Sequence, residues 1–364
     1  MKRLLFITGT RADYGKIKPL IKAAKEAGFS CDVFTTGMHM LSLYGLTMLD
    51  VRRDFEIYPY MNMEPNSPMD DVLSSTISGL GKYVREFRPD LIVVHGDRVE
   101  ALAGASVGAL NNILVAHIEG GELSGTVDGI IRHAVSKLSH LHFVSNEDAA
   151  KRLSQMGESA IYTIGSPDID IMLGELPSLD EVKSHYGIPY DKYSILLFHP
   201  VTSELDHLAS DVREISFAVA DSCGRDNRHW VMIYPNNDTG ANIVLDGFGI
   251  YPSIQIPSMR FEYFLTLLKN ADCIMGNSSA GVREAPVYGV PSINIGTRQA
   301  GRTTNCGIIN VPPEYTAIMR ALNNLPKCEP STEFGRGNAA KLFVHWLKTD
   351  ELWNTPTQKQ FVVK

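Results

Sequence analysis

The sequence predicts an α/β fold made of two domains, each a parallel β-sheet covered by helices. The first observation is the length of 364 residues, which suits about two ordinary domains. The second is a series of short apolar runs, most of them β-branched, as expected for strands buried on both faces of a parallel sheet. The third is the presence of helix-length segments between many of these runs, which is typical of βαβ units.

The first half of the chain carries six of these apolar runs. The expected strands are 4–8, 33–36, 91–95, 113–117, 141–144 and 161–164. The segment 17–27 between the first two places Ile17, Leu20, Ile21 and Ala24 on one face, as an amphipathic helix requires. A second helix is expected over 72–87, so the first half alternates between strand and helix.

The second half repeats this alternation. The expected strands are 194–198, 230–234, 254–256, 273–275, 292–295 and 308–311, and the expected helices are 210–222, 261–270 and 282–287. A final helix over 339–347 follows the last strand and has Leu342, Phe343 and Trp346 to bury.

The alternation lapses once, between residues 174 and 192. This stretch contains Pro177, Pro189 and several charges, and it lacks a strand pattern. We therefore expect a first domain over 1–173, a linker over 174–192, a second domain over 193–336, and a terminal helix and tail over 337–364.

Composition narrows the class of protein. Apolar residues make up 44% and charged residues 21%, as in ordinary globular proteins. The net charge of −7 argues against broad electrostatic binding to nucleic acid or to an anionic membrane.

The five cysteines are widely spaced without a C-x-x-C pair, which favours a reduced, cytoplasmic chain with no zinc site. The apolar run 4–7 is too short for a signal peptide, and the uncharged stretch 101–116 is too short to span a membrane.

Ligands of open parallel sheets bind beyond the carboxyl ends of the strands, so residues directly after each run are site candidates. The first strand leads into Gly9-Thr10-Arg11-Ala12-Asp13, a turn that opens a helix. Backbone N–H groups in such a turn favour an anion, and Arg11 could contact a phosphate. The alternative is an ordinary turn with a surface arginine. There is neither a G-x-G-x-x-G fingerprint nor a Walker A loop in the sequence.

Carboxylates follow the third and fourth strands. Asp97 lies two residues after one strand and Glu119 lies beside two glycines after the next, with Asp128 further along. Neighbouring strands bring such residues to one edge of the sheet. Clustered carboxylates can move protons and stabilise an oxocarbenium-like centre, as glycosidic chemistry requires. The alternatives are that Asp97 caps the next helix, or that Arg98 and Arg132 neutralise a merely polar edge.

Polar residues also follow the strands of the second half. The candidates there are His199, Asn236, Ser278, Ser279, Glu284, Arg298 and Arg302. The two serines open a strand–turn–helix segment whose hydroxyls and N–H groups can hold a phosphate. For the arginines the alternative is a solvated loop, and a lone histidine is more often structural. The metalloprotease motif H-E-x-x-H does not occur, so we do not expect that chemistry.

In combination these motifs resemble the hydrolysing UDP-N-acetylglucosamine 2-epimerases, which begin the synthesis of sialic and related nonulosonic acids. The motifs are GTRADYGK, VHGDR, HIEGGELSGTVD, HPVT, YPNND, GNSSAGVRE and INIGTRQAGR. They extend from Gly9 through Arg302, so the resemblance covers nearly the whole chain. The branch that keeps the nucleotide attached typically has proline after the first-loop arginine. Ala12 stands there in this chain, which favours the hydrolysing branch.

The resemblance implies two Rossmann-like domains facing each other across a cleft, as in GT-B glycosyltransferases, with the last helix crossing back to the first domain. It implies a small nucleotide sugar, a UDP-linked N-acetylhexosamine, as the binding partner, and a homodimer or homotetramer. It implies no cofactor, because nothing is oxidised, and no metal.

The resemblance also assigns residues. The implied catalytic residues are Asp97, Glu119, Asp128 and His199, and the implied substrate and nucleotide ligands are Arg11, Asp13, Arg98, Asn236, Ser278, Ser279, Glu284, Arg298 and Arg302. The chain departs from some relatives at Gly15, Gly129 and Ala280.

The resemblance leaves the substrate open. The first alternative to UDP-N-acetylglucosamine is UDP-N,N′-diacetylbacillosamine or a GDP-linked analogue, which would serve legionaminic-acid synthesis. A GT-B glycosyltransferase is a second alternative, and it would need an acceptor. The third is a nucleotide-binding module without catalysis.

Overall fold

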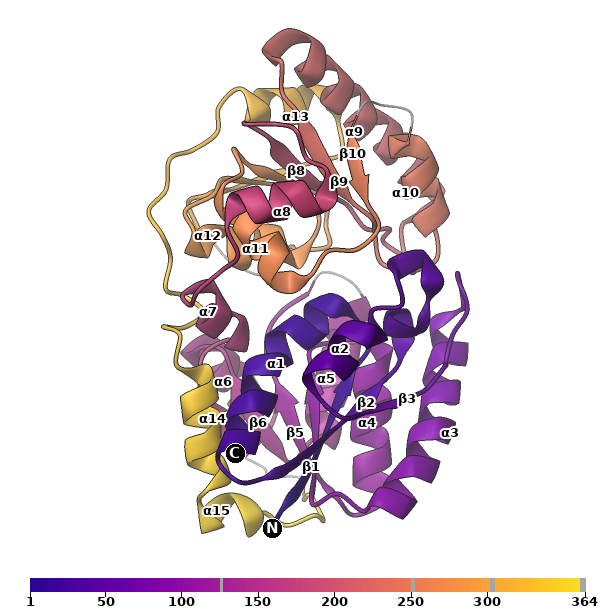
Figure 1. Ribbon diagram of the computed structural model, residues 1–364, viewed down its shortest axis with the longest axis vertical. Helices are drawn as coiled ribbons and strands as arrows, with labels where there is room; N and C mark the ends of the chain where they lie inside the picture. Colours follow the sequence, from indigo (N-terminus) through magenta and orange to yellow (C-terminus); the bar gives the residue numbers. More distant parts are fainter. Residues whose placement is uncertain (125–126, 250–252, 302–304, 361–364) are drawn as a thin grey trace. The chain divides into compact units, whose positions relative to one another are not determined.

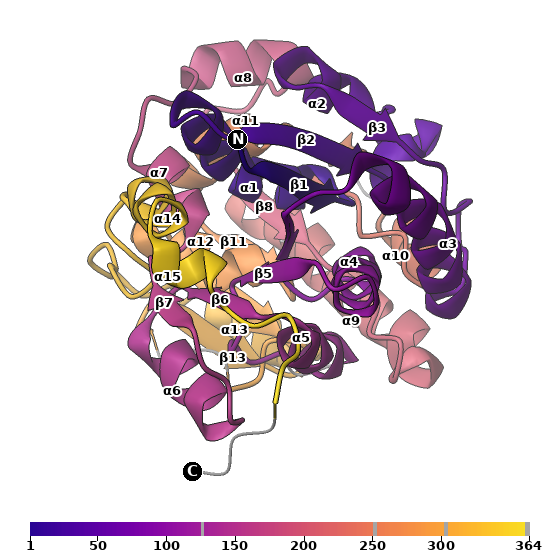
Figure 2. The ribbon, with the colours of Figure 1, turned by 90° about the horizontal axis from the view of Figure 1, so that it is seen from below.

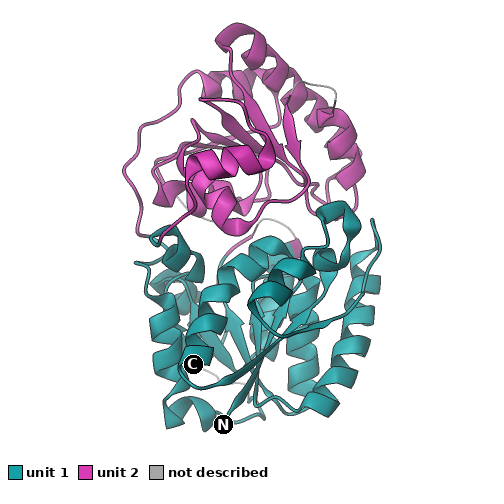
Figure 3. Cartoon of the chain, viewed as in Figure 1, with its two compact units in different colours: residues 1–122, 128–174, 333–364 teal, residues 123–127, 175–332 magenta. Residues whose placement is uncertain are grey.

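The computed structural model describes residues 1–124, 127–249, 253–301 and 305–360 (Figure 1). The chain divides into two compact units, coloured separately in Figure 3. Unit 1 comprises Met1–Glu122, Asp128–Gly174 and Glu333–Lys364, and unit 2 comprises Leu123–Val127 and Glu175–Thr332. Each unit contains a parallel sheet flanked by helices, which confirms the predicted fold class.

Unit 1 is built on a seven-stranded sheet with the order β3-β2-β1-β4-β5-β6-β7, and every pairing is parallel. The strands are β1 (Arg3–Thr8), β2 (Ser30–Thr35), β3 (Ile57–Pro59), β4 (Leu91–His95), β5 (Leu114–Ile118), β6 (Leu141–Val144) and β7 (Ile161–Thr163). The central strands are apolar on both faces and almost fully buried, as the continuous apolar runs predict. In register, His95 lies opposite Ile118, so β4 and β5 end at the same level.

Helices and short 3₁₀ turns surround this sheet. They are α1 (Arg11–Glu26), α2 (Met48–Asp54), α3 (Met69–Phe87), α4 (Val99–Leu110), α5 (Val127–Leu138), α6 (Glu147–Gln155), α7 (Pro167–Met172), α14 (Ala339–Leu347), α15 (Asp350–Trp353), η1 (Gly37–Met40) and η2 (Ser42–Tyr44). Helix α1 begins directly after the first strand because the Thr10 hydroxyl accepts a hydrogen bond from the amide of Asp13 at 3.1 Å.

The C-terminal helix α14 belongs to unit 1, as expected. Figures 1 and 2 both show it, in yellow, alongside α7. Phe343 is fully buried and packs edge-on against Phe6 and Phe143, with ring centroids 6.4 and 4.9 Å apart. The Asp170 carboxylate accepts hydrogen bonds from the amides of Ala339 and Ala340, both at 2.8 Å, and so fixes the start of this helix.

Unit 2 contains a six-stranded parallel sheet with the order β10-β9-β8-β11-β12-β13. Its strands are β8 (Ser194–Leu197), β9 (Trp230–Ile233), β10 (Ile254–Ile256), β11 (Ile274–Gly276), β12 (Ser292–Ile295) and β13 (Ile308–Val311). Its helices are α8 (Leu179–Tyr186), α9 (Leu205–Asp226), α10 (Ala241–Phe248), α11 (Phe261–Lys269), α12 (Glu284–Val287) and α13 (Tyr315–Leu322), with a 3₁₀ turn η3 (Ser279–Gly281). A core of its own, which includes the fully buried Trp230 and Ile215, holds this unit together.

Helix α8 and strand β3 are among the elements that differ from the sequence expectation. Helix α8 lies inside the segment 174–192 that we expected to be a linker, because the Ser178 hydroxyl caps the Glu181 amide at 3.2 Å and Val182 is buried. Strand β3 was not expected, since it is three residues long and ends in Pro59 at the edge of the sheet. Within the described ranges, no helix is both long and apolar enough to cross a membrane.

Candidate active site

The first group of candidate residues gathers at the carboxyl ends of β1, β4 and β5 in unit 1. The strand order reverses direction between β1 and β4, and ligands of open α/β sheets bind at such a switch point. The first turn of α1 supplies Asp13, β4 ends in His95 and is followed by Asp97, and β5 is followed by Glu119. The fold therefore brings these four side chains to one edge of one sheet.

His95 lies between two carboxylates. Its Nδ1–H donates to Asp13 at 2.8 Å and its Nε2–H donates to Glu119 at 3.0 Å. Carboxylates only accept hydrogen bonds, so both ring nitrogens carry protons and the ring is a cation. Burial alone would lower the pKa of His95, but the charge of Glu119 and the hydrogen bonds to both carboxylates raise it to about 9.

Glu119 occupies a constrained position. Its φ of +63° lies in the left-handed region that non-glycine residues rarely adopt, and the side chain is almost fully buried. One carboxylate oxygen accepts from His95, and the other accepts from the Ser166 hydroxyl, which comes from the turn between β7 and α7. Both oxygens thus have a donor, and the direction of the carboxylate is determined by the protein.

Arg132 on α5 connects the two predicted acids. One guanidinium nitrogen donates to the backbone carbonyl of Glu119 at 2.8 Å, and another forms an ion pair with Asp97. Asp128 lies four residues before Arg132 on the same helix, so it shares that helix face. Asp97 does not cap α4, because Arg98 occupies the N-cap position. Its carboxylate is 23% exposed, which leaves it accessible from solvent.

Three of the predicted ligands of this unit have partners within the protein. Both the Nε and one Nη of Arg11 donate to Asp50, at 2.9 and 2.6 Å. Asp13 accepts from the Gly9 amide at 3.0 Å as well as from His95, so it orders the first turn. Arg98 lies 3.4 Å from the buried carboxylate of Glu100.

A second histidine supports the turn before Asp97. His117 is fully buried, and burial lowers its pKa to about 3, so the ring is neutral. Its Nε2–H donates to the Gly96 carbonyl at 2.8 Å, and its Nδ1 accepts from the Ser136 hydroxyl at 3.0 Å. Gly96 has a φ of +71°, which glycine tolerates without strain.

The second group lies at the corresponding edge of unit 2, where the order reverses between β8 and β11. Asn277 follows β11, and its side chain accepts from the His199 amide at 2.7 Å and donates to the His199 carbonyl at 2.8 Å. The Nδ1 of His199 accepts from the Asn236 amide at 3.0 Å. These bonds join the loops that follow β8, β9 and β11.

The remaining residues of the second group surround Asn277. Its carbonyl accepts from Arg298 at 3.3 Å and from Gln299 at 2.9 Å. The Ser278 hydroxyl accepts from the Ala280 amide at 3.3 Å, and Ser279 begins the single turn η3. The expected helix 282–287 is the shorter α12, which begins at the buried Glu284. Arg302 lies outside the described residues.

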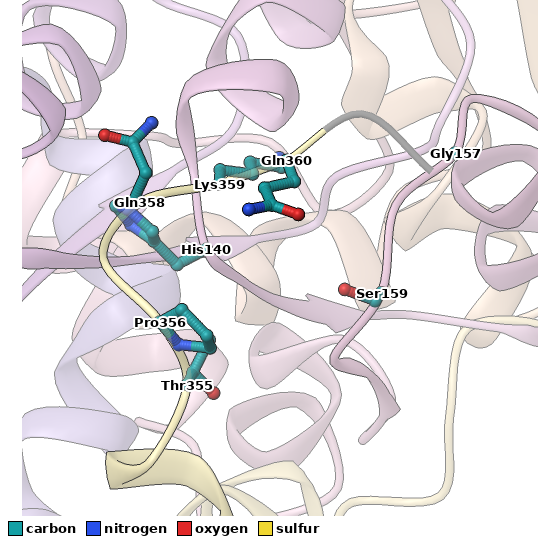
Figure 4. A pocket seen from close by; sticks show the side chains of 8 residues that line it. All are labelled: His140, Gly157, Ser159, Thr355, Pro356, Gln358, Lys359 and Gln360. Atoms are coloured by element: carbon teal, nitrogen blue, oxygen red, sulfur yellow. The ribbon is translucent and has the colours of Figure 1, made fainter. Parts of the chain in front are cut away.

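Two hollows lie at different places in the described part of the chain. A cavity of about 80 Å³ lies at the carboxyl ends of the unit 2 strands, lined by Phe198, Asn277 and Thr297 among others. A larger hollow of about 310 Å³ in unit 1 is lined by His140 and Ser159 together with the tail after α15 (Figure 4). His140 and Ser159 precede β6 and β7, so this hollow lies at the amino ends of the strands, away from the candidate site.

Sequence reasoning missed four residues of these clusters. They are His95, Ser166, Asn277 and Gln299. His95 and Asn277 could have been found, because each is a polar residue at the carboxyl end of an apolar run. Ser166 and Gln299 carry no comparable signal, since their roles depend on the packing of distant segments.

The chain matches the family described as UDP-N-acetylglucosamine 2-epimerase over residues 22–348. It is 47% identical, over 100% of its length and 99% of the relative, to a Neisseria meningitidis protein named UDP-N-acetylglucosamine 2-epimerase. It is 32% identical, over 96% of both chains, to a Legionella pneumophila protein named UDP-N,N′-diacetylbacillosamine 2-epimerase (hydrolyzing).

Solved structures share the fold. The crystal structure of Methanocaldococcus jannaschii UDP-GlcNAc 2-epimerase, in complex with UDP-GlcNAc and UDP, matches with a TM-score of 0.82 at 21% identity, over 95% of this chain and 99% of that chain. The family match covers most of the chain, and the Neisseria relative covers all of it. This chain therefore belongs to the UDP-N-acetylglucosamine 2-epimerase family.

Proposed function

We propose that the chain is a hydrolysing 2-epimerase, which converts UDP-N-acetylglucosamine and water into N-acetylmannosamine and UDP. The observation that carries this proposal is the cluster of Asp97 and Glu119 at adjacent strand ends, held together by Arg132. The names of the Neisseria and Legionella relatives support the reaction and its hydrolysing form, respectively.

The chemistry explains why carboxylates are needed. The C2 proton of the sugar is not acidic, because no carbonyl group neighbours it. When the bond between C1 and the UDP oxygen breaks, its electron pair leaves with UDP and C1 gains oxocarbenium character. The C2 proton then passes to a carboxylate, and the electrons of the C–H bond form the C1=C2 double bond of 2-acetamidoglucal. A proton is next delivered to the opposite face of C2, which renews the oxocarbenium character at C1. Water then attacks C1 and gives up its proton to a carboxylate.

We assign different roles to the acids according to their surroundings. Asp97 is partly exposed and can reach the substrate, so it and Asp128 exchange protons with C2. Glu119 has a donor on each oxygen and is almost fully buried, so it stabilises the developing positive charge as a fixed anion. Buried groups that are held in place cost no reorganisation when the charge develops.

Unit 2 supplies most of the nucleotide contacts in this proposal. Ser278, Ser279 and Arg298 contact the diphosphate, with His199 as a further partner, and Glu284 holds the ribose. Arg11 and Asn236 add contacts, with Asp50 fixing the direction of the Arg11 guanidinium. The hydrogen bonds of Asn277 support this arrangement, because they hold the loops after β8 and β11 together.

Proton NMR in D₂O with UDP-N-acetylglucosamine as the sole substrate tests the reaction. We expect free UDP and N-acetylmannosamine that carries deuterium at C2. UDP release without deuterium at C2 would mean simple hydrolysis, or a transferase that lacks its acceptor. In that case the roles of Asp97 and Asp128 would have to be withdrawn.

A second candidate substrate is UDP-N,N′-diacetylbacillosamine, which the name of the Legionella relative favours. The same reaction would operate on it, because the difference lies at C4 and C6 of the sugar. Measuring kcat/KM for both nucleotide sugars under identical conditions identifies the substrate as the one with the higher value.

A further inference from the structure

Ser166 is a buried hydroxyl directed at the carboxylate of Glu119. It is fully inaccessible to solvent and lies in the turn between β7 and α7. Its Oγ–H donates to one Glu119 oxygen, while His95 on β4 donates to the other. Two donors from different elements therefore set the rotation of this carboxylate.

The backbone of Ser166 is held as firmly as its side chain. Its amide donates to the carbonyl of Phe334 at 2.7 Å, on the segment that leads into α14. Gly165 and Gly335 make this approach possible, because a Cβ on Gly335 would lie 3.2 Å from the Gly165 Cα and 3.3 Å from the Ser166 nitrogen. Gly335 also has a φ of +134°, which strains any other residue.

Ionic contacts fix the following residues of the same turn. Asp168 forms an ion pair with Lys16 of α1 at 3.0 Å, and both side chains are at least 90% buried. Asp170 accepts from the first amides of α14. The turn is thus attached to α1, to α14 and to the segment before α14, so its position cannot adjust easily if the hydroxyl is removed.

We propose that Ser166 is a positioning residue for the epimerisation, which holds Glu119 in the direction that stabilises the oxocarbenium-like centre. This inference rests on the proposed function. Ser166 acts through Glu119, so its loss slows the chemical step. It leaves UDP binding unaffected, because we assign no nucleotide contact to Ser166 or to Glu119.

The experiment compares Ser166→Ala with a matched variant, Ser145→Ala. Ser145 is also buried and donates to a buried carboxylate, Glu122, at 2.7 Å. We expect Ser166→Ala to lower kcat by roughly 10- to 100-fold, the size of effect caused by small misplacements in an active site. KM and the Kd of UDP should change by less than about twofold, since only the chemical step is impaired. Ser145→Ala should lower the melting temperature similarly and leave kcat within about twofold.

A Ser166→Ala variant whose kcat matches that of Ser145→Ala overturns the inference. Ser166→Cys covers the case in which the alanine variant does not fold, because it leaves no cavity but replaces the hydroxyl by a weak donor, and the same loss of kcat is expected. Unchanged kcat in that variant would equally overturn the inference. If the wild-type protein releases no UDP from either nucleotide sugar, the proposed function itself fails. The two failures are distinguishable, because the wild-type assay tests the function and only the variants test the role of Ser166.

Discussion

His95 is the residue whose charge links the stability of unit 1 to its candidate site. Its folded pKa of about 9 exceeds the ordinary value of 6.5, so its contribution is fully present below pH 6.5 and is lost as the pH rises through 9. The shift corresponds to roughly 3 kcal/mol of unfolding free energy. We expect His95→Gln to lower the stability by about this amount at pH 6 and much less above pH 9, as measured by urea unfolding.

The control for this pH dependence is His207→Gln, because His207 is an exposed histidine of unit 2. The free energy of unfolding of this variant should differ from that of the wild type by less than about 0.5 kcal/mol at pH 6 and at pH 10, as for ordinary surface substitutions. If His95→Gln lowered the free energy of unfolding by the same amount at pH 6 and at pH 10, His95 would not be the cation between Asp13 and Glu119.

Asp97 provides the residue-scale test of the chemistry. Asp97→Asn keeps the shape of the side chain but removes its charge and its capacity to accept a proton. We expect kcat to fall by roughly 10²- to 10⁴-fold, whereas the Kd of UDP in calorimetry stays within about twofold of the wild type. Asp54→Asn is the matched control, because Asp54 is 21% exposed and also forms an ion pair, with Lys18 at 2.8 Å. Near-normal turnover of the Asp97 variant would show that this residue is structural.

Position relative to the apolar runs identifies some residues of the candidate site from the sequence, but not their partners. Asp97 and Glu119 are candidates from the sequence because each follows an apolar run, and neighbouring parallel strands end at one edge of the sheet. The pairing of His95 with Asp13 could not be predicted, because it joins residues 82 positions apart. Arg11 was predicted as a phosphate ligand from its turn, but its pairing with Asp50 depends on the packing of α2.

Among the elements, the loops after β8 and β11 carry the sharpest prediction. Asn277→Ala removes both hydrogen bonds to the His199 backbone and leaves a buried amide and carbonyl without this partner. We expect the Kd of UDP, measured by calorimetry, to rise about tenfold or more, since a lost hydrogen-bond pair of this kind costs roughly 1–3 kcal/mol.

The control for the loop prediction is Asn294→Ala in β12. Asn294 is equally buried, and its amide donates to Asn310 at 2.8 Å within the sheet and not at the loops. This variant should lose stability without losing affinity for UDP. Equal loss of affinity in both variants would mean that the effect is a general weakening of unit 2 and not a property of the loops.

Periodicity predicted the elements well wherever an apolar run was long. The expected strand 91–95 has the bounds of β4, and 292–295 has those of β12. The short edge strand β3 contains an exposed residue and two partly buried ones, so it had no apolar run to reveal it. Helix α8 has a single buried side chain, Val182, and therefore shows almost no amphipathic pattern.

For the whole molecule, the division into two units predicts that stability is also divided. Each unit has its own sheet and its own core, and unit 1 is completed by α14 from the far end of the sequence. Phe343 is the fully buried side chain that α14 places between Phe6 and Phe143. A substitution that destabilises one core should therefore increase unfolding mainly in the unit that contains that core.

Hydrogen exchange read by mass spectrometry tests this division. Phe343→Ala should destabilise unit 1 by roughly 3–5 kcal/mol through the cavity it leaves. Amides of β1, β5 and β6 should then exchange faster, while those of β8 and β9 keep their wild-type rates. Phe248→Ala, in the core of unit 2, should produce the reverse pattern, since Phe248 is also almost fully buried. If either variant accelerated exchange equally in both sheets, the two units would unfold as one cooperative body, and the C-terminal helix would stabilise the entire chain and not unit 1 alone.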